Sequence, residues 1–378
     1  MDFRLSEEQK IFQTSARKFF EAELLPIVDE LEAACEFPAE FYRFCGKHGF
    51  LGINIPEMYG GADADTVTCT ILTEEISRID TGFAGTVLTA SMAAPLLLME
   101  VGREEQKQRY LDGISTGERI IAFALTEPNA GSDTAGIQTT AREEGDEYVV
   151  NGNKTFITNG ATADAYILVA YTDKSKGYKG INVFLIDRET PGISVTKNLD
   201  KLGWSTSETV ELAFEDVRIP RDSRLGREGL GGALELINFG RIMVGAASVG
   251  LATAALNEAM RYVKEREAFG RPIAKFQVIR HRLARMQMQI ETCRLLTRQA
   301  AWRRDRGLSH RKESSHVKYH CGEMAKEVTS KALQLFGGYG YMNEFPVSRY
   351  FRDAQVLTIA DGTSDIQREV IAREIGLD

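Results

Sequence analysis

Apolar residues in the first 120 positions recur every three or four residues, which is the spacing of amphipathic helices. A first helix is predicted after Ser6, which together with Gln9 has the spacing of a capping box. Its apolar face continues through Phe12, Ala16 and Phe19. Further helices in this part of the chain are expected at residues 71–78 and 84–101.

The pattern changes near residue 120 to short apolar runs separated by turn residues. Asn151-Gly152 stands between two such runs and predicts a β-hairpin, because Asn-Gly accepts the positive φ of a type I′ turn. Short strands without intervening helices predict an antiparallel sheet or barrel. The strands are expected at residues 148–150, 154–158, 166–171, 181–186, 193–196 and 209–214.

The last part of the chain is again helical. Long periodic segments with few breakers cover residues 234–265, 277–306 and 316–336. Long helices with short connections predict an antiparallel bundle. The expected organisation is α+β, with an N-terminal helical domain at residues 1–120, a β-domain at 121–230 and a helical bundle at 231–378.

Composition narrows the class of protein. The 378 residues are 43% hydrophobic and carry a net charge of −8, which suits several packed domains and argues against nucleic-acid binding. The five cysteines are odd in number and form no CxxC pair, so neither a disulfide framework nor a zinc site is expected. His316 and His320 have helical spacing but no third metal ligand nearby, which favours a surface pair.

The N-terminus offers no targeting signal. Met1-Asp2-Phe3-Arg4 lacks a basic start followed by an apolar run, and no stretch of 18 uncharged apolar residues follows. We therefore expect no signal peptide and no membrane span. A cytoplasmic location follows, or the mitochondrial matrix if a transit peptide has been removed.

Two loop segments could hold a ligand. In Phe123–Asp133 the turn residues Pro128, Asn129 and Gly131 leave hydroxyl groups and backbone free to bind a polar heterocycle or an acyl carrier, although on loop chemistry alone a plain turn is favoured. In the segment 154–160, Phe156 could stack on an aromatic cofactor; alternatively the segment is a strand with one face in the core.

Two turns that follow long helices could also either bind a ligand or serve only as structural turns. Arg266 and Arg271 flank a break made by Gly270 and Pro272, where guanidinium groups could pair with phosphate oxygens or simply solvate the turn. The glycines of Phe336-Gly337-Gly338-Tyr339-Gly340 allow close approach to a ligand or cap a helix. No strand precedes them, so they are not a dinucleotide fingerprint.

The last segment is Ile359-Ala360-Asp361-Gly362-Thr363-Ser364. Thr363 or Ser364 is expected to cap a helix that begins just after Asp361. Taken alone, Asp361 would be interpreted as structural, because the helix dipole favours a negative charge at that end.

Together the five segments resemble the acyl-CoA dehydrogenase family in content, order and spacing. The resemblance rests on Thr-Glu-Pro-x-Ala-Gly-Ser-Asp at 126–133, Arg-x-x-Phe-Gly-Arg at 266–271, Phe-Gly-Gly-x-Gly at 336–340 and Gly-Thr-Ser-x-Ile-Gln-Arg at 362–368. It implies an N-terminal helical domain, a middle antiparallel β-barrel domain and a C-terminal four-helix bundle. It also implies FAD as cofactor, an acyl-CoA substrate, an electron-transferring flavoprotein as acceptor and a homotetramer.

The resemblance assigns roles to individual residues. Asp361 becomes the base that takes the α-proton of the thioester while flavin N5 takes the β-hydride. Positions that match substrate contacts are Ser132, Arg241, Gly362 and Arg373. Positions that match flavin contacts are Phe123, Leu125, Thr126, Ser132, Phe156 and Thr158, with Thr363 and Asp365 touching the cofactor again. Positions that match contacts to the adenosine pyrophosphate of a neighbouring subunit are Arg266, Phe269, Gln277, Gln334, Gly337 and Gly338.

The chain departs from the family pattern at the base. The family's usual Tyr-Glu is replaced by Ala360-Asp361, so both residues facing the acyl pocket are smaller. A second family position for the base holds Gly240, and the opposite wall at 89–92 holds no carboxylate, so α,β-elimination through Asp361 is expected. These departures favour a branched or alicyclic substrate such as cyclohexanecarboxyl-CoA. The alternatives are a short straight acyl-CoA, an oxidase, monooxygenase-like or desulfinase relative, and a non-catalytic acyl-CoA binder.

Overall fold

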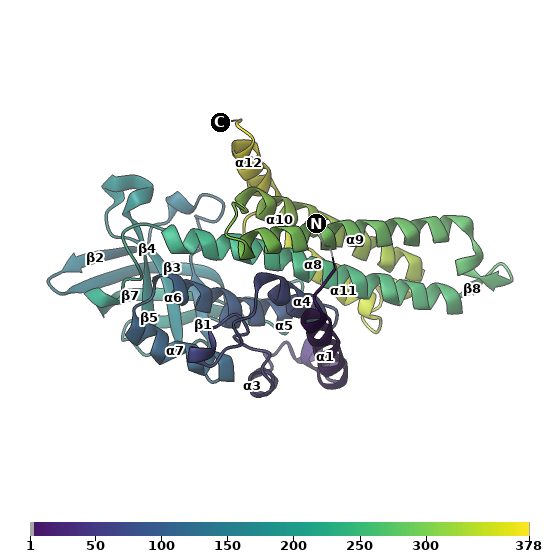
Figure 1. Ribbon diagram of the computed structural model, residues 1–378, viewed down its shortest axis with the longest axis horizontal. Coiled ribbons are helices and arrows are strands. Elements are labelled where there is room, and N and C mark those ends of the chain that lie inside the picture. The colour runs from purple at the N-terminus through teal and green to yellow at the C-terminus, as the bar shows by residue number, and fades with distance from the viewer. Residues whose placement is uncertain (1–3, 378) are drawn as a thin grey trace.

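Helices make up the first part of the chain in the computed structural model, which describes residues 4–377 (Figure 1). The predicted capping box is confirmed, because Gln9 N donates to Ser6 Oγ and Ser6 N donates to Gln9 Oε1, both at 3.1 Å. Residues 1–3, on which the expectation about a signal peptide partly rests, lie outside the described residues. The helices are α1 (Glu7–Glu23), α2 (Val28–Ala34), α3 (Ala39–Lys47), α4 (Thr66–Ser77), α5 (Thr81–Val87), α6 (Ala94–Val101) and α7 (Glu104–Thr116).

The helix expected at 84–101 contains a π-helical segment, Leu88–Ala93, between α5 and α6. Two side-chain hydroxyls contact the backbone of the preceding turn here: Thr89 Oγ1 donates to the Gly85 carbonyl at 3.0 Å, and Ser91 Oγ donates to the Val87 carbonyl at 2.8 Å. Such back-bonding competes with the regular helical hydrogen bonds and bends helices. π-Helical turns of this kind occur frequently at functional sites.

A seven-stranded sheet forms the middle domain, with β1-β4-β2-β3-β7-β6 in order and β5 paired with β4. Most pairs are antiparallel as expected, but β1 and β2 run parallel to β4. The strands of each parallel pair are joined by a longer stretch of chain than the strands of a hairpin. Strand periodicity alone does not reveal such a pairing. The strands are β1 (Ile121–Ala124), β2 (Thr140–Glu144), β3 (Glu147–Thr158), β4 (Ala165–Tyr171), β5 (Ile181–Asp187), β6 (Ile193–Asn198) and β7 (Thr209–Pro220).

The hairpin predicted at Asn151-Gly152 is wrong. The hairpin turn lies at Gly145-Asp146, between β2 and β3, and β3 passes straight through Asn151. Gly152 instead sits at a bulge with φ +150°, where the register against β7 shifts. A Cβ on Gly152 would lie 2.3 Å from Thr139 Oγ1, so the glycine is required by a close approach of chain segments.

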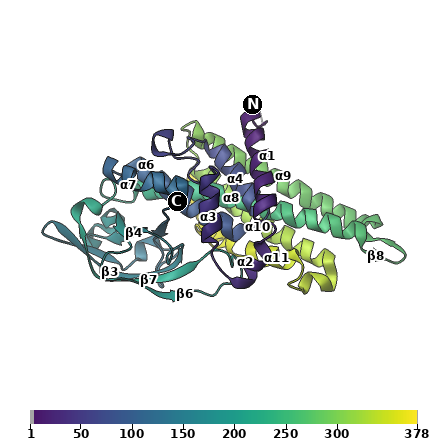
Figure 2. The same cartoon turned by 90° about the horizontal axis from the view of Figure 1, so that it is seen from below.

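Long helices form the last domain and reach away from the sheet (Figure 1). α4 lies against this bundle, and α1 packs on α4 (Figure 2). The contact between α4 and α8 is close, since a Cβ on Gly250 of α8 would lie 2.3 Å from the Glu74 carbonyl of α4. The elements are α8 (Gly231–Glu265), α9 (Gln277–Asp305), α10 (Arg311–Phe336), α11 (Pro346–Ala354) and α12 (Ser364–Glu374), with the short strands β8 (Glu267–Ala268) and β9 (Arg271–Pro272).

Two helical stretches are long and apolar enough to cross a membrane, Thr81–Val101 and Gly232–Glu265. The sequence had led us to expect none. Within the fold, however, 89% and 94% of their most apolar windows are buried against other parts of the protein. They therefore serve as core helices, which pass the same test of length and composition.

Candidate active site

Asp361 lies in the turn between the short helix Val356–Thr358 and α12. Its backbone has φ +53°, a left-handed conformation that is costly for a residue other than glycine. Neighbouring side chains fix this turn: Gln367 Nε2 donates to the carbonyls of Asp361 at 3.2 Å and Gly362 at 3.0 Å. As predicted, Thr363 caps α12 by accepting from Ile366 N at 3.3 Å.

The side chain of Asp361 points at α8. A Cβ built on Gly240 would lie 3.2 Å from Asp361 Oδ2, so the carboxylate occupies the space beside this glycine. One residue further along α8, Arg241 is buried, and its Nε lies 3.5 Å from the Asp361 carbonyl oxygen. The structure thus brings together Asp361, Gly362 and Arg241 from the predicted set.

Burial raises the pKa of Asp361 above its ordinary value, while the cations Lys318 and Arg241 act in the opposite direction. As a whole residue Asp361 is exposed to solvent. The burial that acts on its pKa is therefore the crowding of the carboxylate against α8, where Oδ2 lies 3.2 Å from a Cβ built on Gly240. The sequence left open whether burial or the start of α12 would dominate. In the folded protein burial outweighs the cations, which brings the carboxylate closer to the range useful for a general base.

The predicted flavin residues gather at the end of β1 and on β3. Thr155 N donates to the Thr126 carbonyl at 2.9 Å and joins the two segments. Phe156 has φ +58° at a register shift, and 67% of it is exposed. An exposed aromatic side chain beside Thr158 is suited to stacking on a planar ring system, and such a ring would shield Phe156 from solvent.

A buried ion pair that we did not single out from the sequence supports this segment. Lys154 Nζ lies 2.8 Å from both Glu127 Oε1 and the Leu125 carbonyl oxygen. Glu127 in turn accepts from the Thr139 amide at 3.0 Å and from the Gln138 amide. Burial lowers the pKa of Lys154 to about 8, while Glu127 opposes that change. The pair fixes the backbone on which Leu125 and Thr126 stand.

The predicted phosphate and adenosine residues form a separate group. A cavity of about 460 Å³ is lined by Arg266, Gln334, Gly337 and Gly338, among others. It lies near β8, at the end of the bundle away from the sheet (Figure 1). Phe269 beside it is 94% exposed. Within one chain, the structure does not bring this group to the flavin residues.

The remaining predicted residues lie at the surface. Ser132 is exposed in the loop after β1, and Gln277 is exposed at the start of α9. Asp365 pairs with Arg368 at 2.6 Å, and Arg373 pairs with Glu369 at 2.9 Å, both on α12. Arg373 thus engages an acidic neighbour on its own helix.

Sequence reasoning missed Lys318, Gln367 and the Glu127–Lys154 pair. Glu127 lies within the motif at 126–133, so the sequence could have indicated that it has a role at the site. Lys318 carries no comparable signal, because it stands among polar and aromatic residues in His316-Val317-Lys318-Tyr319-His320. Within residues 4–377 no group of three or more His, Cys, Asp and Glu side chains is arranged to hold a metal ion.

Comparison with known proteins places this geometry in a family. Three family models match consecutive parts of the chain: the acyl-CoA dehydrogenase N-terminal domain at residues 6–118, the middle domain at 122–217 and the C-terminal domain at 227–376. Together they cover nearly the whole sequence and follow the three structural parts described above.

Individual relatives agree over their full lengths. A short-chain-specific acyl-CoA dehydrogenase of Clostridium acetobutylicum is 43% identical, over 99% of this chain and 100% of the relative. The CarC subunit of the caffeyl-CoA reductase-Etf complex of Acetobacterium woodii is 42% identical, over 97% and 98%. The structure of butyryl-CoA dehydrogenase from Megasphaera elsdenii superimposes with a TM-score of 0.96 at 40% identity, over 99% and 100%. The chain belongs to the acyl-CoA dehydrogenase family and is an FAD-dependent oxidoreductase.

Proposed function

We propose that this chain oxidises an acyl-CoA thioester at its α,β-bond, with Asp361 as the base that removes the α-proton. The observation that carries the proposal is the Asp361 carboxylate, which is held beside Gly240 on a turn fixed by Gln367 and Arg241. FAD, when bound, supplies the acceptor for the β-hydride. Phe156, Thr158 and the loop after β1 would hold its ring, with Lys154 and Glu127 fixing that loop.

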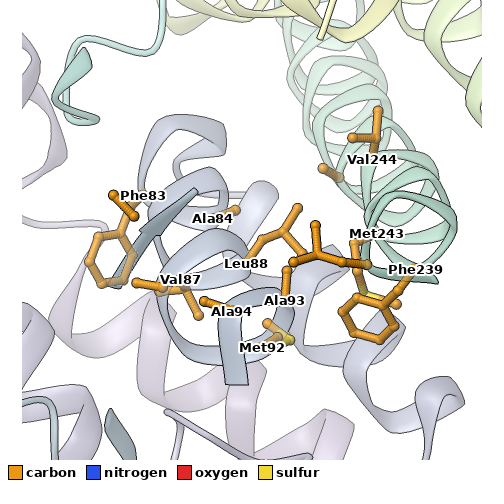
Figure 3. Close-up of a cluster of buried hydrophobic side chains, with 14 of the residues drawn as sticks. Phe83, Ala84, Val87, Leu88, Met92, Ala93, Ala94, Phe239, Met243 and Val244 are labelled. Carbon is orange, nitrogen blue, oxygen red and sulfur yellow. The ribbon is translucent and has the colours of Figure 1, made fainter. Parts of the chain in front are cut away.

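The acyl group is proposed to be short. Two of the three relatives described above are named for short-chain and butyryl-CoA substrates. The third is named for caffeyl-CoA. Figure 3 shows a buried apolar cluster in which Leu88 and Met92 of the π-helical segment face Phe239 and Met243 of α8. All four side chains are buried, and Phe239 directly precedes Gly240. We propose that this cluster limits the depth of the acyl pocket.

A short acyl group with a branch or ring at the α-carbon is the second candidate. Ala360 and Asp361 are both smaller than the Tyr-Glu usual in the family, which leaves volume near the reacting carbon. Aspartate also reaches one methylene less far than glutamate, and a misplacement of about 1 Å can cost on the order of a hundredfold in rate. Cyclohexanecarboxyl-CoA is an example of a substrate whose bulk would meet the shorter base.

A substrate panel with a dye acceptor separates these candidates. We expect butyryl-CoA to be oxidised with the highest kcat/KM, and octanoyl-CoA poorly. Preference for isobutyryl-CoA or cyclohexanecarboxyl-CoA over butyryl-CoA would select the branched candidate. Fast oxidation of octanoyl-CoA would contradict a short acyl pocket, and failure of every thioester to bleach the flavin would overturn the proposed activity.

We also propose that the active unit contains at least two copies of this chain and belongs to a homotetramer. The proposal is supported by the position of Arg266, Gln334 and Gly338 far from the flavin residues of the same chain, beside the exposed Phe269. A second copy would bring such a group to the flavin of its neighbour. Light scattering of the holoenzyme should give a tetramer, and a monomer that retains FAD would contradict it.

An electron-transferring flavoprotein is the proposed acceptor of the electrons. The Acetobacterium woodii relative is named as a subunit of a complex with such a protein. Reduced enzyme should therefore pass electrons to a purified electron-transferring flavoprotein much faster than to oxygen. Rapid reoxidation by oxygen would instead indicate an oxidase.

A further inference from the structure

One face of α10 lies against the turn that bears Asp361. Ser315 and Gly322 are two turns apart on this face, and each touches the site. Ser315 Oγ lies 3.4 Å from Arg241 Nη1. A Cβ on Gly322 would lie 2.6 Å from the Leu357 carbonyl oxygen, just before the Asp361 turn. Lys318 stands between them at helical spacing and therefore faces the same turn.

Lys318 is completely buried, with 0% of its surface exposed. Its Nζ makes no hydrogen bond to any of the residues 4–377. A buried ammonium group without a hydrogen-bond partner is costly, and burial lowers the pKa of Lys318 to about 8 while Asp361 opposes that change. Asp361 is the acidic group that acts on it most strongly, ahead of Glu323.

The charged groups around the carboxylate come from two helices. Arg241 acts on it from α8 and Lys318 acts on it from α10. Two further groups of α10 act on these cations, Arg311 on Arg241 and Glu323 on Lys318. Lys318 lowers the pKa of Asp361 more than Arg241 does. Arg241 is also engaged elsewhere, since its Nη1 lies 3.2 Å from Asn238 Oδ1. Glu323 accepts a hydrogen bond from Ser364 Oγ at 2.7 Å.

We propose that Lys318 is a positioning residue for the base, whose buried ammonium group keeps the Asp361 carboxylate ionised and ready to accept the α-proton. The inference rests on the proposed function, because it assigns Lys318 a role through Asp361. Burial favours the protonated acid, which cannot take a proton from the substrate. A cation held in the same low-dielectric surroundings offsets that preference without touching the substrate.

The pH dependence of flavin reduction in the holoenzyme tests this role. In Lys318→Met the acid limb of the rate profile should move upward by at least about one pH unit, because an opposite charge close to a carboxylate lowers its pKa by roughly that amount or more. At a pH below both limbs the variant should then be about tenfold slower or worse. At high pH, where Asp361 is ionised in both proteins, the rates should converge.

Matched variants separate the charge from the packing. Lys318→Arg keeps the charge and should leave the acid limb near its original pH. Lys331→Met removes a lysine from the same helix, where it pairs with Glu327, and should leave the profile unchanged. Lys318→Gln removes the charge but keeps a polar side chain, and it should shift the limb like Lys318→Met, so it serves if the methionine variant does not fold.

A limb that stays in place in Lys318→Met or Lys318→Gln, or a loss of equal size at every pH, would overturn the role of Lys318. The proposed activity fails in a different way. If acyl-CoA does not bleach the wild-type flavin, or if Asp361→Asn is bleached like the wild type, the base itself is misassigned.

Discussion

The Asp361 carboxylate and the backbone of Gly240 share one small space, because a Cβ at position 240 would lie 3.2 Å from Asp361 Oδ2. Two positions distant in sequence, one on α8 and one in the turn before α12, thus point at the same location. In this chain one of them carries the carboxylate and the other leaves room for it.

Replacement of Gly240 by alanine should slow the reaction without unfolding the protein. The added methyl group would be closer to the carboxylate than ordinary packing allows, so Asp361 must move by a few tenths of an ångström. We expect a loss of roughly threefold to tenfold in the rate of flavin reduction, since a misplacement of about 1 Å can cost on the order of a hundredfold. Stopped-flow bleaching measures it, with the FAD absorbance as control for folding.

An unchanged rate in Gly240→Ala would mean that the carboxylate does not act from the position seen here. The reciprocal test moves the base. Asp361→Gly combined with Gly240→Glu mounts a carboxylate on α8 and should recover part of the activity lost in Asp361→Gly alone.

Loss of the buried Lys154 ammonium group should destabilise the flavin loop. Lys154→Met leaves Glu127 buried without its cation, which typically costs about 3–5 kcal/mol. We expect a lower midpoint of urea unfolding and a protein that is purified with less FAD. The double variant Glu127→Gln, Lys154→Met removes both charges and should recover part of the stability. Equal stability of the single and double variants would contradict a coupled pair.

The free energy of unfolding should depend on pH because of the buried Asp353 carboxyl group. It accepts from Trp204 N at 2.7 Å, and burial raises its pKa to about 7, with Asp80, Glu32 and Arg349 acting nearby. Because the folded protein holds the proton more tightly than the unfolded chain, this group stabilises the fold at low pH. That contribution is lost as the pH rises from about 4 through 7.

Asp353→Asn should remove this dependence, since the amide stays neutral and still accepts the hydrogen bond. Relative to the variant, the wild type should lose up to about 4 kcal/mol between pH 4 and pH 7.5. Urea unfolding of both proteins at several pH values measures the difference. A difference that does not change with pH would show that Asp353 does not titrate in this range.

Shortening the Met92 side chain should change the acyl chain length that the enzyme prefers. Met92→Ala would open space in the buried cluster of Figure 3, beside the π-helical segment. We expect kcat/KM for hexanoyl-CoA and octanoyl-CoA to rise relative to butyryl-CoA, with a stability cost of about 2–5 kcal/mol from the cavity. An unchanged ratio of the three substrates would place the acyl pocket elsewhere.

The sequence predicted the long helices well, because their apolar periodicity extends over many turns. It failed at Asn151-Gly152, because the positive φ of Gly152 belongs to a bulge within β3 and not to a hairpin turn. It identified Asp361 only through its neighbours. It missed Lys318 because one lysine among the polar residues of a helix gives no sign of what it faces. The separation of Arg266 from Phe156 depends on how α8 runs through the fold, which local sequence does not encode.

The most direct test of Asp361 as the base is anaerobic titration of the Asp361→Asn holoenzyme with butyryl-CoA or isobutyryl-CoA, whichever reduces the wild type faster. Asp200→Asn, an exposed change between β6 and β7, is the matched control. We predict that Asp361→Asn binds FAD and stays yellow, while the wild type and the control bleach. Bleaching of Asp361→Asn at the wild-type rate would contradict the account.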